Sequence, residues 1–189
     1  MELKERVSYD IDKSAERMDA ILSAGDDSFR DKEYIPSHRE LDYENGYYVN
    51  AAAVFIDIIG SSKLTAANTT PVLAKIYRSY ISECIAVMRG CPVCREISIH
   101  GDCVYGIFDI RQKADIDSVF GVAAGLNSLV DILSFKLQKH GYSRIIGGIG
   151  MDQGRGHTDR CRHGEGSAVH AGHGAQQSAD NTVSAADIL

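Results

Sequence analysis

The 189-residue sequence lacks a long apolar run, a signal-peptide core and an excess of positive charge. Because no stretch of about 18 apolar residues occurs, we expect no membrane span. The net charge of −6 offers no broad basic surface to nucleic acid or to an anionic membrane. Charged residues run through the N-terminal segment, where a signal peptide would be apolar. These absences predict a cytoplasmic protein that binds neither membranes nor nucleic acid.

Cysteine occurs at only five positions, an odd number with irregular spacing, which argues against a disulfide framework. Cys91 and Cys94 form a CxxC motif. A helical pattern precedes this motif and a strand pattern follows it, which is the reverse of the thioredoxin arrangement. A zinc site would need a second pair of ligands at a suitable spacing, and the sequence has none. We therefore expect loop cysteines with no redox or metal role.

Aromatic residues and apolar periodicity are missing from the last part of the chain. From Gly154 onward there is no aromatic residue, and after Arg162 there is no lysine or arginine. Such a composition predicts disorder. The tail also holds four of the seven histidines, but their spacing matches no familiar set of metal ligands.

The rest of the sequence is ordinary for one globular domain. Hydrophobic residues make up 44% and charged residues 24%, and the length is sufficient for a proper core. Residues 1–45 are polar, with a short helix predicted around 12–23, and are interpreted as a connecting or regulatory segment. Residues 46–153 carry the apolar patterns and form the predicted domain. Residues 154–189 are the atypical tail.

Apolar spacing along residues 46–153 predicts alternating strands and helices. Thr70 and Pro71 suit the cap and first turn of a helix, and Gly90 with Pro92 suits its end. The predicted elements are a strand (47–59), a helix (71–88), a hairpin (95–110) with its turn at 100–103, a helix (116–139) and a strand (142–151). This order predicts an α+β sandwich with helices on one face of a mostly antiparallel sheet.

Two carboxylates stand out against these patterns. Asp57 interrupts a buried strand, where an unpaired charge is costly, so an arginine or a metal ion must neutralise it. Asp102 lies at a Gly-Asp turn, which by itself is common turn chemistry. The hairpin follows the first helix, so its turn can lie beside the first strand. Two converging carboxylates next to a Gly-Ser-Ser turn are typical of a site for Mg²⁺ or Mn²⁺ with phosphates.

Three segments, in order, resemble the motifs of class III nucleotidyl cyclases. FIDIIGSSKL (55–64) is similar to the first motif, F-x-D-I-x-G-[FS]-[ST]-x-L. ISIHGDCVYGIF (97–108) is similar to the second, a Gly-Asp turn followed by an apolar strand that ends in Phe. IIGGIGMDQG (145–154) is similar to the third, a Gly-Ile strand with a downstream Gly. The resemblance covers roughly residues 47–153 and implies the ferredoxin-like α+β sandwich of that family.

The resemblance also implies a reaction and a set of roles. Asp57 and Asp102 would bind two Mn²⁺ or Mg²⁺ ions, with the carbonyl of Ile58 as a further ligand. The ribose 3′-hydroxyl would attack the α-phosphate and expel pyrophosphate, with one ion activating the 3′-oxygen and the other holding the triphosphate. The nucleotide-binding residues that the resemblance implies are Phe55, Gly60, Ser61 and Ser62.

One departure from the motifs of adenylate cyclases concerns recognition of the nucleotide base. Adenylate cyclases of this class carry a lysine four residues before the second-motif aspartate, where it reads adenine, and Ser98 stands there in this chain. CREISIHGDCVYGIFD and the Tyr47-Tyr48 pair instead resemble the pyrimidine cyclases of bacterial antiphage (Pycsar) systems. Those enzymes make cyclic UMP or cyclic CMP after infection and so activate a partner effector. The resemblance implies UTP or CTP as substrate, with Tyr48 and Ser98 as base-pocket candidates, although core or interface roles suit the tyrosines equally.

A second departure concerns the tail. The family ends its catalytic half with an Asn-x-x-x-Arg helix that contacts the transition state across a head-to-tail homodimer, and no such pattern follows Gln153. Our hypothesis is that the reading frame changes near Gly154, so that another frame of the gene encodes an apolar segment with Asn and Arg. Three alternatives remain: a non-catalytic nucleotide-binding pseudo-cyclase, a purine (cAMP or cGMP) cyclase, and a plain α+β domain that leaves the three motifs unexplained.

Overall fold

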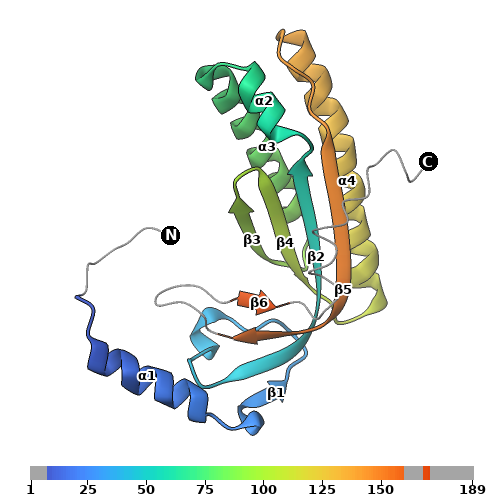
Figure 1. Cartoon of the computed structure of the whole chain (residues 1–189). Coiled ribbons are helices and arrows are strands. Elements are labelled where there is room, and N and C mark those ends of the chain that lie inside the picture. The colour runs from blue at the N-terminus through green and yellow to red at the C-terminus, as the bar shows by residue number, and fades with distance from the viewer. Residues whose placement is uncertain (1–7, 160–167, 171–189) are drawn as a thin grey trace.

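The computed structural model describes residues 8–159 and 168–170, which form an α+β fold (Figure 1). The sheet has the strand order β3-β4-β2-β5-β6, and β1 pairs with β2 beside this path. The pairing of β1 with β2 is parallel, and the other described pairs are antiparallel. The strands are β1 (Phe29–Asp31), β2 (Gly46–Ile58), β3 (Cys94–His100), β4 (Cys103–Asp109), β5 (Gly147–Asp159) and β6 (Ala168–His170). The helices are α1 (Ile11–Ser23), α2 (Ser61–Ala67), α3 (Thr70–Arg89) and α4 (Lys113–Lys139), with single turns of 3₁₀-helix at Asp26–Ser28 and His38–Glu40.

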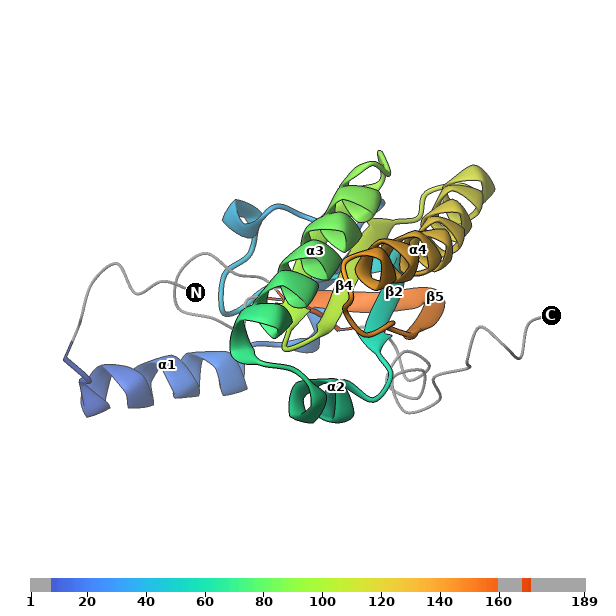
Figure 2. The ribbon, with the colours of Figure 1, turned by 90° about the horizontal axis from the view of Figure 1, so that it is seen from above.

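Helices α3 and α4 lie side by side on one face of the sheet (Figures 1 and 2). Val54 and Ile56 of β2 are fully buried in the core between this sheet face and the helices. The buried residues of α3 recur at every fourth position, which is the spacing of one helix face: Ile76, Tyr80, Cys84 and Met88. The predicted α+β class, with helices on one face of a mostly antiparallel sheet, is confirmed.

On the opposite face of the sheet, the segment between β1 and β2 packs through Ile35, which contacts a small cluster formed by Val49, Ala53 and Ile107. This cluster does not reach the end of β2. Within residues 8–159 and 168–170, the sheet therefore has an open half-face beside the last residues of β2, on the side away from α3 and α4.

Strands β2 and β5 pair along their whole lengths, from Gly46 opposite Asp159 to Ile58 opposite Gly147, with no shift in register. The predicted last strand (142–151) therefore starts too early and ends too early. The predicted tail boundary at Gly154 is also wrong, because β5 continues to Asp159. The ladder hydrogen bonds are made by backbone groups, so the missing apolar alternation did not prevent them. The rest of the predicted tail, apart from 168–170, lies outside the described residues, and the frame change stays a prediction.

The expectation of no membrane span bears on α4. This 27-residue helix contains an 18-residue window with a mean hydropathy of 1.5, which is apolar enough to cross a membrane by length and composition. The absence of a membrane span therefore stays a prediction. A core helix of a soluble protein meets the same criterion, and α4 buries Val119, Leu126 and Leu133 in the main core. The composition of α4 is therefore weak evidence for a membrane.

Candidate active site

The structure brings Asp57 and Asp102 together at one end of the sheet. Asp57 is the next-to-last residue of β2, and the pairing of β2 with β4 runs to Ile56 opposite Val104. Continuing this antiparallel register by two residues places the Gly101–Asp102 turn level with the end of β2. Gly101 has a φ of 64°, a conformation that glycine adopts readily and that closes the turn between β3 and β4. The convergence of the two carboxylates that the sequence predicts is present.

Neither carboxylate is neutralised by a side chain that the structure describes. Oδ1 of Asp57 and Oδ2 of Asp102 are buried and accept no hydrogen bond from the described residues. Burial raises the pKa of Asp57, and the negative charge of Asp102 raises it further. Within the described ranges, the ion pairs of lysine and arginine involve other acids, so the alternative of an arginine partner for Asp57 finds no support.

This donor set fits a hard divalent cation. Carboxylate and carbonyl oxygens are the ligands that Mg²⁺ and Mn²⁺ prefer, and a cation would cancel the repulsion between Asp57 and Asp102. Ile58 follows Asp57, and its side chain is apolar and only 3% exposed. The group that Ile58 can offer to a metal ion is therefore its backbone carbonyl oxygen. The described part of the chain has no group of three or more His, Cys, Asp or Glu side chains that could together hold a metal ion. The aspartates therefore form a partial ligand set, which phosphate oxygens of a substrate would complete.

The turn after β2 offers backbone donors next to the aspartates. Gly60 has a φ of 75° and is the N-cap residue of α2, without a side-chain hydrogen bond to the helix start. The first N–H groups of a helix have no partner within the helix, so those of Ser61 and Ser62 can face an anion. The predicted turn is therefore present three to five residues beyond Asp57 in the chain, and its role in binding phosphate stays a prediction.

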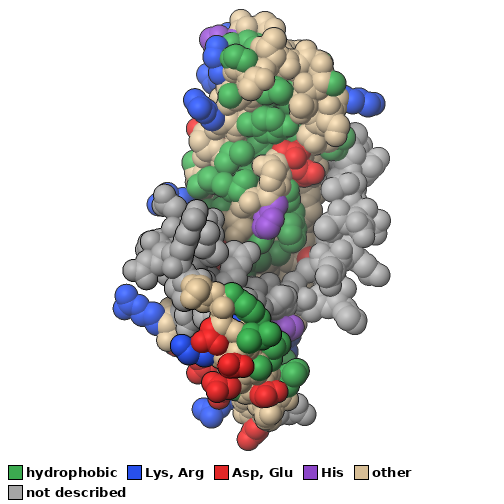
Figure 3. Space-filling model, turned by 60° about the vertical axis from the view of Figure 1, so that its left-hand side comes forward, with side chains coloured by type: hydrophobic (Ala, Val, Ile, Leu, Met, Phe, Trp, Pro, Cys, Tyr) green, Lys and Arg blue, Asp and Glu red, His purple; other side chains and the backbone are tan. Residues whose placement is uncertain are grey.

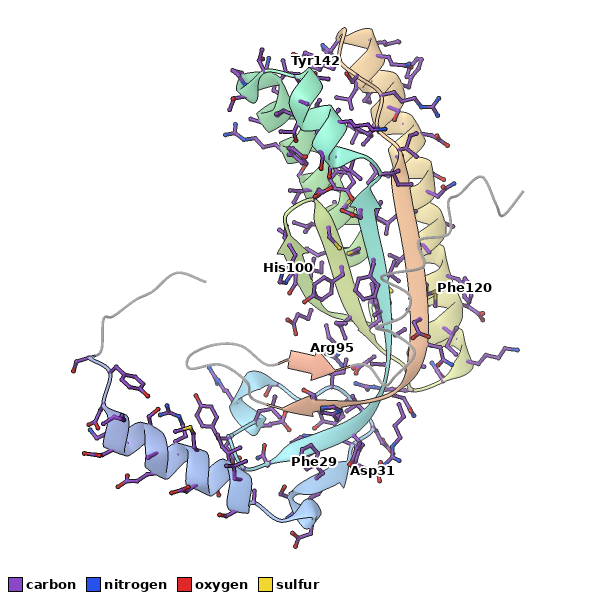
Figure 4. All side chains as sticks on the ribbon, in the orientation of Figure 1. Phe29, Asp31, Arg95, His100, Phe120 and Tyr142 are labelled. Carbon is purple, nitrogen blue, oxygen red and sulfur yellow. The ribbon has the colours of Figure 1, made fainter. Side chains whose placement is uncertain are left out.

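A row of side chains lies beside the aspartates on the open half-face. Phe55 is opposite Tyr105 across β2 and β4, and Tyr105 is opposite Ser98 across β3 and β4, so the three share one face of the sheet. The ring centroids of Phe55 and Tyr105 are 5.5 Å apart, and those of Tyr105 and His100 are 5.7 Å apart. His100 is labelled in Figure 4, at the edge strand β3. Figure 3 shows hydrophobic side chains gathered over the upper part of the molecule, above a lower part where acidic side chains cluster.

The two predicted base-pocket residues lie in different places. Ser98 belongs to the row just described. Tyr48 precedes Asp57 by nine residues in the same strand, which corresponds to roughly 30 Å at the usual rise of a strand. The Tyr48 ring contacts Phe29 and the guanidinium of Arg155 instead. A single chain therefore does not bring Tyr48 to the aspartates, and it could join such a site only from a second subunit.

Two residues near the aspartates were missed by the sequence reasoning. His100 alternates with Ser98 along β3, so strand periodicity could have placed it on the same face. Tyr80 was interpreted as one member of the apolar stripe of α3, and nothing in the local sequence distinguishes it from a core residue. Its hydroxyl is buried without a hydrogen-bond partner among the described residues.

Comparisons with known proteins agree with this geometry. No protein-family model matches the chain. Two solved structures, the guanylyl cyclase Cya2 and the adenylyl cyclase CyaB from P. aeruginosa, superpose with TM-scores of 0.64 at 13% and 14% identity. They cover 72% and 71% of this chain and 71% of each of the two solved chains. A class III adenylyl cyclase-like ATP-binding protein from Pseudomonas aeruginosa covers 94% of this chain and 41% of its own, with a TM-score of 0.57 and 14% identity. The fold is therefore that of class III nucleotidyl cyclases.

The relatives found by sequence indicate a narrower class of cyclase than the fold does. A uridylate cyclase from Gulbenkiania mobilis is 35% identical over 155 residues, which cover 78% of this chain and 60% of the relative. A uridylate cyclase from Treponema porcinum is 35% identical over 117 residues, 62% of this chain and 41% of the relative. The chain therefore has the fold of the class III nucleotidyl cyclases and is similar in sequence to two pyrimidine cyclases, as its motifs predict. It spans only about half the length of these curated relatives, so their whole activity is a proposal for this chain.

Proposed function

We propose that this chain is a pyrimidine nucleotide cyclase, which converts UTP or CTP to the 3′,5′-cyclic monophosphate and pyrophosphate. The observation that carries the proposal is the pair of Asp57 and Asp102, whose buried carboxylate oxygens lack partners in the described structure. Two acids at one point repel each other unless one of them keeps its proton or a cation binds between them. The likeness to two uridylate cyclases supports a pyrimidine base in particular.

The reaction exchanges one bond at phosphorus. The ribose 3′-oxygen loses its proton and bonds to the α-phosphorus, and the bond from that phosphorus to pyrophosphate breaks. Asp57, Asp102 and the Ile58 carbonyl would hold two Mn²⁺ or Mg²⁺ ions, whose charge stabilises the 3′-oxyanion and the leaving pyrophosphate. The chain itself fixes the two carboxylates on a continuous strand and a tight turn, so their separation is set before substrate binds.

The remaining site residues would position the nucleotide. The N–H groups of Ser61 and Ser62 would bind the polyphosphate at the start of α2. The rings of Phe55 and Tyr105 give a flat apolar surface beside the aspartates. Ser98, in the same row, can both donate and accept a hydrogen bond, which suits the polar edge of uracil or cytosine.

We propose that the chain acts as a homodimer, and the position of Tyr48 supports this. This residue would complete the base pocket of a neighbouring subunit, because its own Asp57 lies roughly 30 Å away along β2. The aspartates of one subunit would then act on a nucleotide whose base is read partly by the other.

The cellular role that we propose is a cytoplasmic second-messenger enzyme of antiphage defence, acting through an effector that binds the cyclic nucleotide. The likeness of CREISIHGDCVYGIFD to the Pycsar cyclases supports this role. Cells that express the chain together with its neighbouring genes should resist phage, and cells that carry Asp57→Ala should not.

The direct test is to incubate the purified chain with UTP, CTP, ATP and GTP separately in the presence of Mn²⁺. Mass spectrometry should detect cyclic UMP or cyclic CMP, and Asp57→Ala and Asp102→Ala should abolish it. Asp131→Ala, on the exposed side of α4, is the matched control and should leave the product unchanged. Cyclic AMP or cyclic GMP would move the chain to the purine cyclases.

A non-catalytic nucleotide-binding domain is the second candidate. The observation in its favour is that the sequence has no Asn-x-x-x-Arg pattern after Gln153, where the family places these contacts. Loss of one such contact typically raises a barrier by about 3 kcal/mol. This candidate predicts Mn²⁺-dependent nucleotide binding with no cyclic product from any of the four triphosphates.

A further inference from the structure

Helix α1 carries an apolar stripe that is exposed in the part of the chain that the structure describes. Four apolar residues recur at the three- and four-residue spacings of one helix face: Ile11, Ala15, Met18 and Leu22. Ile11 is 68%, Met18 51% and Leu22 83% exposed. Figure 1 shows α1 extending away from the sheet and from the other helices. A 13-residue helix is marginal by itself in water, so this stripe needs an apolar partner.

A groove with an apolar wall lies between α3 and α4. Its volume is about 620 Å³, and four apolar side chains of α4 line it: Leu129, Ile132, Leu133 and Leu137. Along α4 the groove extends from Leu129 to His140, a length of about 16 Å at the usual rise of a helix. The stripe of α1 from Ile11 to Leu22 has the same length. A helix such as α1 could therefore cover the groove from end to end.

The end of the groove near Tyr142 is basic. Lys75 donates a 3.1 Å hydrogen bond to the Tyr142 hydroxyl, and the ring centroids of His140 and Tyr142 are 6.3 Å apart. Lys136 lies one helical turn before His140 and also lines the groove. Glu83 lies eight residues after Lys75, about 12 Å along α3, so the opposite end of the groove is acidic.

Helix α1 carries the complementary charges in the matching order. Asp10 and Asp12 lie at its start, and Arg17 follows Asp10 by seven residues, about 10 Å along the helix. Laid parallel to α3, the helix would bring Asp10 and Asp12 to the basic end of the groove and Arg17 towards Glu83. Between residues 10 and 19 the chain has four acids and two bases, which suits the two lysines and the histidine of the groove.

The groove that α1 can reach belongs to a second copy of the chain. In Figure 1, α1 lies beside β1 at the lower end of the molecule, and Figure 4 labels Tyr142 of the groove at the upper end. Pairing of two α1 helices is less favourable, because Asp12 and Asp19 flank the stripe on one side. In a parallel or an antiparallel pair, the positions opposite these acids hold no base.

We propose that α1 of one copy docks, through its apolar stripe, in the groove between α3 and α4 of a second copy. The contact buries apolar side chains that are exposed on both surfaces, and the charges at the two ends of the groove fix the direction of α1. This inference goes beyond the proposed function, because neither Asp57 nor Asp102 takes part in the contact.

The contact is tested with whole chains that carry the photo-crosslinking residue p-benzoylphenylalanine in place of Met18. These chains are mixed with ¹⁵N-labelled wild-type chains and irradiated, and mass spectrometry identifies the crosslinked peptides. We expect crosslinks between copies that end on residues 129–142 of the labelled chain. Crosslinks to α1 of the labelled chain would show that two α1 helices pair, and would overturn the docking.

Two variants of the labelled chain separate the groove from the rest of α4. Ile132 is 55% exposed, and Ile132→Glu places a charge on the apolar wall, so the crosslink yield should fall by about ten-fold. Phe120→Glu is the matched control, because Phe120 is 61% exposed on the same helix and does not line the groove. The yield with Phe120→Glu should equal that of the wild type. An equal loss in both variants would show unspecific apolar adhesion and would overturn the docking.

The remaining outcomes also decide. Crosslinks within one chain, crosslinks to other surfaces or the absence of crosslinks would each overturn the docking. If Ile132→Glu does not fold, the position of the crosslinks on the wild-type chain decides. Production of a cyclic nucleotide is measured separately, so failure of the docking leaves the proposed function standing, and a chain without cyclase activity can still dock.

Discussion

The backbone N–H of Ile35 donates a 2.7 Å hydrogen bond to Oδ1 of Asp109, which lies 74 positions further along the chain. Asp109 is the last residue of β4 and its side chain is 1% exposed. Its other oxygen accepts hydrogen bonds from Arg95 at 2.5 Å and from Arg111 at 3.0 Å. One buried carboxylate thus joins the segment before β2 to strand β3 and to the start of α4.

Asp109→Ala should therefore destabilise the fold. The substitution leaves the Ile35 N–H without its partner and two half-exposed arginines without a counter-charge, which should lower the free energy of unfolding by about 2–3 kcal/mol. Urea denaturation measures this change. The control is Asp131→Ala, since Asp131 and Arg144 are exposed and 3.7 Å apart, and its effect should stay below about 0.5 kcal/mol. Equal effects of the two substitutions would contradict the anchoring role.

Asp57 should destabilise the metal-free fold increasingly as the pH rises. Its pKa is raised by burial and then by Asp102, so the folded chain keeps this proton at pH values where the unfolded chain, with an ordinary pKa of 3.8, has lost it. The folded state then binds more protons, and its stability falls as the pH rises through the raised pKa. In Asp57→Asn, residue 57 has no titratable group and no negative charge to repel Asp102. Urea denaturation in EDTA at pH 4, 6 and 8 should show an advantage of Asp57→Asn that grows with pH, and a constant difference would contradict this reasoning.

Mn²⁺ should stabilise the wild-type chain and fail to stabilise variants that lack either aspartate. With 3′-deoxy-UTP present and Mn²⁺ at ten times its dissociation constant, mass action adds about 1.4 kcal/mol. For a chain of this size the melting temperature should rise by roughly 3–6 °C. Scanning calorimetry of wild type, Asp57→Ala and Asp102→Ala measures the shift. A wild-type shift that persists in Asp102→Ala would place the metal elsewhere.

Ser98→Ala should weaken discrimination of the base without altering the fold. Loss of one hydrogen bond to a pyrimidine edge should lower kcat/KM for the preferred triphosphate by about five-fold, which corresponds to about 1 kcal/mol. Steady-state rates with UTP and CTP measure the effect. Ser82→Ala is the control, because Ser82 lies exposed on α3 and bonds locally to the Ser79 carbonyl. Unchanged rates in Ser98→Ala would remove Ser98 from the base pocket.

Two glycines should respond to alanine in opposite directions. At Gly106 an added Cβ would meet the Phe108 ring at 2.9 Å and Met88 Sδ at 3.2 Å, so Gly106→Ala should cost about 1–3 kcal/mol. At Gly121, within α4, an added Cβ would meet nothing within 4 Å. Gly121→Ala should therefore stabilise the fold by about 0.5–1 kcal/mol, since glycine weakens helix interiors. Thermal or urea denaturation measures the direction of both changes in stability.

Local patterns were enough to predict the main elements and the meeting of Asp57 with Asp102. The order of strand, helix and hairpin leaves few ways to connect them, and the shortest brings the hairpin turn beside the first strand. Helix α2 was not predicted, because seven residues after Gly60 are too few to show a period. The extension of β5 to Asp159 was not predicted either, since backbone pairing leaves no mark on side-chain alternation.

Tyr80 illustrates what sequence cannot supply. Its spacing from Ile76 and Cys84 is that of a core stripe, and the structure confirms the burial. Which strand residues it packs against depends on how far α3 is displaced along β4, and this alignment is set by packing between elements distant in sequence. Tyr48 shows the converse, because a residue that resembles part of a base pocket lies at the far end of the strand that carries Asp57.

The thirteen-residue pairing of β2 with β5 has a consequence for mutations that change chain length. Successive residues of a strand face opposite sides of a sheet, and no bulge interrupts this ladder. A single-residue insertion or deletion anywhere between Gly46 and Asp57 would therefore turn the carboxylate towards the helices and Ile56 towards solvent, unless a new bulge absorbed it. The number of residues in β2 is therefore fixed by the side of the sheet on which Asp57 must emerge.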